Sequence, residues 1–190
     1  MTASPSVRIA HPSEEDELIR MCRLLHEENG LFDFDEKKVR DVLRRCFTRS
    51  GSIVGVIGQP GRIEASTCLL ISDMYYTSTW HLAELWNFVL PEYRKSSNID
   101  ALIEFGKNCS NTIGIPLITG IITNSRLAGK VRLYRRHLGY PAGAFFVYNA
   151  KWIGDDRPVE NEYLYAVETR AQTRRRERQI KQMNGSAHVR

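Results

Sequence analysis

The sequence contains no apolar run that approaches the roughly 18 residues a membrane helix needs. Its first residues, MTASPSVRIAHPSEEDEL, also lack the apolar core of a signal peptide, so we expect a cytoplasmic protein. Cysteines are few and stand far apart, with no C-x-x-C pair among Cys22, Cys46, Cys68 and Cys109. This spacing argues against zinc ligation and against a disulfide framework, and it favours buried thiols.

The composition is that of a globular protein, and its basic charge is unevenly placed. At 190 residues, with 42% hydrophobic residues, the chain is long enough for one domain with a real core. We expect this domain over residues 1–152 and a basic extension over 153–190. The formal net charge is +5, of which the residues from 161 onward carry +4. The basic segment 170–181 either contacts phosphates of RNA or DNA or is a solvated end.

The hydrophobic periodicity predicts an α+β fold, a mixed central sheet flanked by helices, in the order β-α-α-β-β-β-α-β-α-β. Strands are predicted at 7–10, 52–58, 63–72, 80–90, 115–123 and 142–149. Helices are predicted at 14–29, 35–47, 97–109 and 124–137. Between the second and third strands, Pro60 and Gly61 fit the central positions of a type II turn.

A basic, hydroxyl-rich turn lies where the fourth predicted strand leads into a helix, in NFVLPEYRKSSNIDALIEF (87–105). Ser97, followed three residues later by Asp100, has the form of a capping box. The helix N-terminus offers free N–H groups and partial positive charge, and Arg94 and Lys95 add full charges beside it. The turn either holds an anion such as phosphate or is a capped helix with a solvated basic surface.

A second informative stretch is TNSRLAGKVRLYRRHLGY (123–140). Asn124 or Ser125 can cap the predicted helix, and Gly139 ends it. Tyr134 lies on the inward side, where its phenol can donate a proton or simply pack in the core.

Taken together and in this order, the two stretches resemble the GCN5-related N-acetyltransferase superfamily. VLPEYRKSSNIDALIEF is similar to the acetyl-CoA-binding segment of that family, and NSRLAGKVRLYRRHLGY is similar to its later N…Y-x-x-x-G-F/Y segment. The resemblance extends over about residues 7–149. It implies acetyl-CoA as co-substrate, no metal, and direct attack of an amine on the acetyl carbonyl without a covalent enzyme intermediate.

The resemblance also implies roles for individual residues. Backbone amides of the turn would hold the CoA diphosphate, namely those of Arg94, Lys95, Ser96, Ser97, Asn98 and Ile99. Phe88 and Val89 would pair with the pantetheine arm, and Asn124 would touch the same arm. Tyr134 would protonate the departing thiolate.

The turn departs from the family pattern at two small positions, which hold Ser97 and Ile99 here. The Ile99 side chain either crowds the diphosphate or turns inward to the core. A chain whose turn no longer held CoA would be a binding module that works through its basic extension. That module is one alternative, and an acyltransferase that acts on a nucleic acid brought to it by the basic extension is the other.

Glu84, the only carboxylate in the predicted strand 80–90, is the candidate general base. Simple alternation places it with Phe88 and opposite Val89, whereas family bases share the face of that valine. A β-bulge would bring Glu84 to the expected face; otherwise it is a structural or surface carboxylate. His81 and Asn87 are the other polar candidates.

For the site that would bind the acceptor amine, the only indication in the sequence is a group of acidic residues. In the family, the first two helices and their connection shape the acceptor site. Here that connection carries acidic residues, namely Glu27, Glu28, Asp33 and Asp35. They either suit a cationic small-molecule or side-chain amine or are solvated charges at helix ends. A homodimer is plausible for the family.

Overall fold

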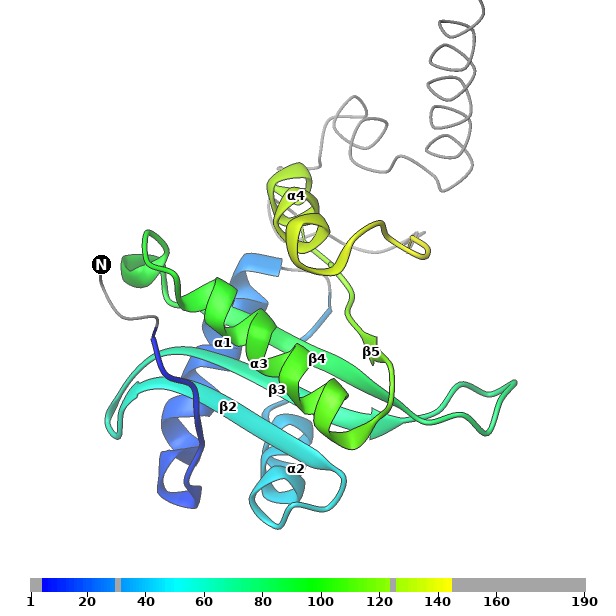
Figure 1. Cartoon of the computed structure of the whole chain (residues 1–190). Coiled ribbons are helices and arrows are strands. Elements are labelled where there is room, and N and C mark those ends of the chain that lie inside the picture. The colour runs from blue at the N-terminus through cyan, green and yellow to red at the C-terminus, as the bar shows by residue number, and fades with distance from the viewer. Residues whose placement is uncertain (1–4, 30–31, 124–125, 145–190) are drawn as a thin grey trace, which may run out of the picture. The chain divides into compact units, whose positions relative to one another are not determined.

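The computed structural model of the chain describes residues 5–29, 32–123 and 126–144. It divides into two compact units, residues 1–120 and 121–190. The first unit is an α+β fold with a five-stranded mixed sheet, as predicted (Figure 1). Its strands are β1 (Arg8–Ile9), β2 (Ser52–Gln59), β3 (Arg62–Ser72), β4 (His81–Val89) and β5 (Leu117–Ile118). Its α-helices are α1 (Glu15–Asn29), α2 (Glu36–Phe47) and α3 (Asn98–Ile113).

The sheet follows chain order, β1-β2-β3-β4-β5. The first four strands are antiparallel neighbours, and β5 runs parallel to β4. This last pairing is short, because only Leu82 with Leu117 and Ala83 with Ile118 are in register. The predicted strand 115–123 is therefore reduced to two residues. Among the described residues, the ladder between β4 and β5 ends at Ala83 and Ile118.

The helices cover the two faces of the sheet (Figure 1). The apolar sides of α1 and α2 form one core with one face of the strands, in which Leu18, Leu43, Val54, Cys68 and Phe88 are buried. On the opposite face, Leu102 of α3 packs with Ile57, Ala65 and Val89. Each of these helices is held by one apolar stripe, as its sequence period predicts.

Two glycines set local boundaries. Gly114 adopts a left-handed conformation, with a φ of 77°, and ends α3 at Ile113, four residues later than predicted. Gly61 has a φ of 79°, as the second central residue of a type II turn requires.

The second unit contains α4 (Leu127–Leu138), which ends before Gly139 as predicted. Its predicted start at residue 124 is wrong. The helix begins after Arg126, which has a φ of 54° and provides no side-chain cap. Asn124, Ser125, most of the predicted strand 142–149 and the whole basic extension lie outside the described residues, as does the expected boundary at 152.

All four cysteines are free thiols, and those of Cys22, Cys46 and Cys68 are buried, as expected. Burial raises the pKa of the Cys22 thiol to about 12. Within the described ranges, no three metal-ligating side chains come together. The helices there are too short or too polar to cross a bilayer.

Candidate active site

Strand β4 contains a β-bulge at Leu85. Leu69 of β3 pairs with Glu84, whereas the adjacent Cys68 pairs with Trp86, so that Leu85 has no partner in β3. Because residues paired across a sheet point to the same face, Glu84 lies on the face of Leu69 and Trp86 on the face of Cys68. The extra residue reverses the alternation that the sequence alone implies.

The bulge brings three candidate residues to one face of β4. Glu84, Asn87 and Val89 all lie on the side of the sheet that α3 covers, while Phe88 is buried beneath α1 and α2. The amide Nδ2 of Asn87 donates to Oε2 of Glu84 at 3.4 Å. The β-bulge needed to place a carboxylate on the valine face is therefore present. His81, at the start of β4, is buried.

The edge of β4 that faces away from β3 offers a backbone group to a ligand at Val89. The N–H of Leu90 donates to the carbonyl of Glu64 at 3.0 Å, on the β3 side. Since the peptide groups of a strand point alternately to its two sides, those of Val89 and Asn87 point away from β3. The carbonyl of Val89 accepts from Arg94 Nε, which leaves its N–H for a ligand. The backbone of Phe88 points to β3. Of the two residues expected to pair with an extended arm, Val89 is the one with a suitable orientation.

The turn before α3 presents three backbone N–H groups for which the described residues supply no acceptor, those of Lys95, Ser97 and Ile99. The other N–H groups are bonded within the turn: Arg94 to Pro91 O at 3.4 Å, Ser96 to Tyr93 O at 3.1 Å and Asn98 to Ser96 Oγ at 3.2 Å. Because α3 has 16 residues, its dipole adds positive potential at this end. Unpaired N–H groups at a helix N-terminus are a common site for phosphate.

The predicted capping box is wrong. Ser97 stands at the N-cap position, with φ −87° and ψ 14°, but its side chain makes no capping hydrogen bond. Ser96 does this instead, because its Oγ accepts from Asn98 N–H and donates to Tyr93 O at 2.6 Å.

Side chains of the turn that could have blocked a ligand point into the protein. Ile99 packs against the core cluster that contains Val89 and Leu102, so it turns inward. Asn98 is buried, and its Nδ2 donates to Oε2 of Glu64 at 3.1 Å. The turn is thus anchored to β3 and keeps its outer surface clear.

The two basic residues of the turn differ. The guanidinium of Arg94 is held by Glu28 of α1, and its Nε donates to Val89 O at 3.1 Å. Lys95 is exposed, and no described residue forms an ion pair with it. Among the described residues, the cation beside the free amides that is not held by a carboxylate is therefore Lys95.

The acidic connection between α1 and α2 is partly committed to structure. Asp35 caps α2 by accepting from Lys38 N–H at 3.1 Å, and Glu28 holds Arg94. These two carboxylates thus have structural roles, and their presence does not require that they bind an acceptor amine. Tyr134 lies half-buried in α4, in the second unit.

Neither protein-family models nor curated proteins match this sequence. Solved structures do match its fold. A GCN5-related N-acetyltransferase from Ralstonia eutropha aligns with a TM-score of 0.58 at 16% identity, over 75% of this chain and 96% of that one. A predicted acetyltransferase from Clostridium acetobutylicum, solved with acetyl-CoA, aligns at 0.60 and 13% identity, over 76% and 95%.

A third similar structure is AAC(6')-Iy in complex with the bisubstrate analogue CoA-S-monomethyl-acetylneamine. It aligns with a TM-score of 0.59 at 11% identity, over 80% of this chain and all of that one. These identities are low, and what the structures share with this chain is the fold. The chain has the GCN5-related N-acetyltransferase fold, as the two sequence stretches indicated.

Proposed function

We propose that this chain, from its GCN5-related N-acetyltransferase fold, transfers the acetyl group of acetyl-CoA to a primary amine. The observation that carries the proposal is the pairing of two features, the free amides before α3 and the nearby edge of β4 at Val89, which lies beyond the short pairing with β5. The amides suit a diphosphate, and a strand edge suits an extended, amide-bearing arm. CoA combines these two groups.

Different residues would bind the diphosphate and the pantetheine arm of CoA. The N–H groups of Lys95, Ser97 and Ile99 would hold the diphosphate, with the Lys95 ammonium adding charge. Val89 would bond the pantetheine arm, and by resemblance Asn124 would touch it. Glu84 lies five residues back along β4, but the bulge makes this four ladder steps, roughly 13 Å from Val89, so an extended arm at Val89 leads toward the carboxylate.

The proposed chemistry is a direct transfer. Glu84 accepts the proton of the attacking amine as its nitrogen bonds to the thioester carbonyl carbon. The carbon–sulfur bond then breaks, and Tyr134 gives its phenolic proton to the departing thiolate. The products are an amide and free CoA. Among the structures of this fold, one holds acetyl-CoA and another a CoA bisubstrate analogue, which supports the same co-substrate here.

Calorimetric titration of the full chain with acetyl-CoA, free CoA and pantetheine tests the proposal. We expect saturable micromolar binding of both CoA forms and far weaker binding of pantetheine, because it lacks the diphosphate. An amine screen that follows release of free thiol would then identify the acceptor. Absence of binding at millimolar acetyl-CoA would refute the enzyme proposal and favour a binding module that works through residues 170–181.

A further inference from the structure

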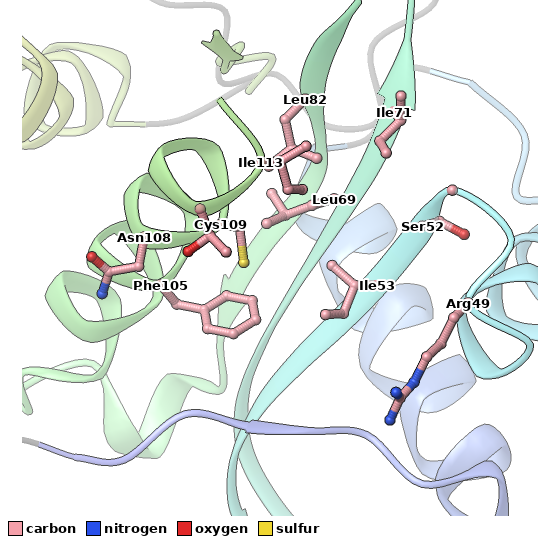
Figure 2. Close-up of a pocket in the computed structure, with 12 residues that line it drawn as sticks. Arg49, Ser52, Ile53, Leu69, Ile71, Leu82, Phe105, Asn108, Cys109 and Ile113 are labelled. Atoms are coloured by element: carbon pink, nitrogen blue, oxygen red, sulfur yellow. The ribbon is translucent and has the colours of Figure 1, made fainter. Parts of the chain in front are cut away.

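An apolar cavity of about 390 Å³ lies in the first unit under the C-terminal half of α3 (Figure 2). This volume is within the range of small-molecule sites. Its wall is built mainly from apolar side chains of the sheet and of α3: Ile53, Leu69, Ile71, Leu82, Phe105 and Ile113. From Ile99 to Thr112 the helix rises roughly 20 Å, so the cavity is separate from the turn proposed to hold CoA.

The cavity has one charged residue at its rim, Arg49. Figure 2 shows it beside β2, with its guanidinium directed away from Leu69 and Leu82. Arg49 has a φ of 55°, a conformation that favours glycine or asparagine over a residue with a long side chain. No described residue forms an ion pair or hydrogen bond with its guanidinium. The position thus keeps an unpaired cation where a neutral residue would fit the backbone better.

Polar groups on the opposite wall are neutral. Asn108 and Cys109 project from α3, and Cys109 is half-buried among apolar neighbours. Burial raises the pKa of its thiol, which stays protonated near neutral pH. None of the described residues that line the cavity carries a carboxylate. A ligand that complements these walls has an apolar body and a single negative charge.

We propose that this cavity binds a small carboxylic acid with an alkyl tail, of the medium-chain fatty acid class. Its tail lies between Leu69, Leu82 and Phe105, and its carboxylate extends past Ile53 to the rim. There the exposed Arg49 side chain turns toward the cavity to pair with it. A charge-assisted, bidentate pair is the strong form of contact that arginine makes with a carboxylate.

Calorimetric titration of the full chain with octanoate, octylamine and octan-1-ol tests this proposal, because the three share one alkyl chain and differ in charge. We expect saturable binding of octanoate, at least about tenfold tighter than that of octylamine, with octanol between them. Octanoate should also slow the alkylation of Cys109, followed by mass spectrometry, which places the ligand in this cavity. Equal affinities, or no protection of Cys109, would overturn the proposal.

Two variants complete the design. Arg49→Gly removes the charge and suits the left-handed backbone, so we expect an unchanged or higher melting temperature, about tenfold weaker octanoate binding and unchanged octanol binding. Ile53→Trp fills the cavity and should abolish binding of both while leaving acetyl-CoA affinity as it was. Octanoate affinity that survives in both variants would refute the assignment. These readouts do not depend on whether the chain binds CoA.

Discussion

Reversing the charge of Lys95 should weaken acetyl-CoA binding by an amount that can be estimated. With the ammonium about 8 Å from a diphosphate of charge about −2, each unit of charge contributes about 1 kcal/mol at a dielectric constant of about 80. Lys95→Glu changes two units, about 2 kcal/mol, or roughly 30-fold in Kd at low salt. At about 0.15 M salt the Debye length is about 8 Å, which reduces the effect to about fourfold.

The assay is calorimetric titration with acetyl-CoA at low and at physiological salt. Lys37→Glu is the matched control, because Lys37 is exposed on α2, across the sheet from α3, and the substitution makes the same change in net charge. We expect the control to bind acetyl-CoA like the unmodified protein at both salt concentrations. If the two variants behaved alike, or if the effect of Lys95→Glu did not shrink with salt, the diphosphate would not lie at this turn.

Four further results are expected. Glu84→Gln should lower acetyl transfer about 100-fold and remove the acidic limb of the pH–rate profile, with acetyl-CoA affinity unchanged in calorimetry. Tyr134→Phe should lower turnover about 100-fold and affinity little, whereas equal losses would make it a packing residue. Glu14→Gln should reduce the free energy of unfolding by about 2 kcal/mol in urea titrations, because Glu14 is buried and bonds both guanidinium NH groups of Arg8, at 2.8 and 2.6 Å. The hydrogen bonds from Arg8 hold the pKa of Glu14 below its ordinary value in the folded protein. The stabilisation is therefore complete above the pKa of Glu14 in the unfolded chain and is lost as the pH falls through its pKa in the folded protein. The difference in free energy of unfolding between the original protein and Glu14→Gln should accordingly shrink in acid. Gly55→Ala should cost about 1–3 kcal/mol by the same assay, because its methyl would lie 2.8 Å from the Phe105 ring and 2.9 Å from Val7. A variant as stable as the original would show that Phe105 can move.

The order of the elements was readable from the sequence because local patterns determine it. The apolar stripe of α1 and the turn at Gly61 each depend on residues within a few positions, and both are where the sequence predicts. The end of α3 was placed four residues early, because the apolar pattern weakens before Gly114, the residue that ends the helix.

Features set by pairing across the chain were not readable in the same way. The capping box at Ser97 failed because Ser96 forms the competing bonds to Tyr93 and Asn98, a choice that depends on how Asn98 is anchored to β3. Likewise, Arg94 looked like a free cation because its partner Glu28 is 66 residues away in sequence. The cavity beside Arg49 could not be predicted, because the only local sign of it is an arginine that follows the cap of α2.

The bulge at Leu85 has a consequence for comparing this chain with others. Removing Leu85 would leave Glu84 paired with Leu69 and directly before Trp86, so the strand would alternate regularly and the carboxylate would keep the α3 face. For the same reason, an alignment of β4 without a one-residue gap equates Glu84 with core positions of strands that lack the bulge. The bulge thus places a carboxylate that stands five residues before Val89 on the same face as that valine, which counting residues along the strand would not show.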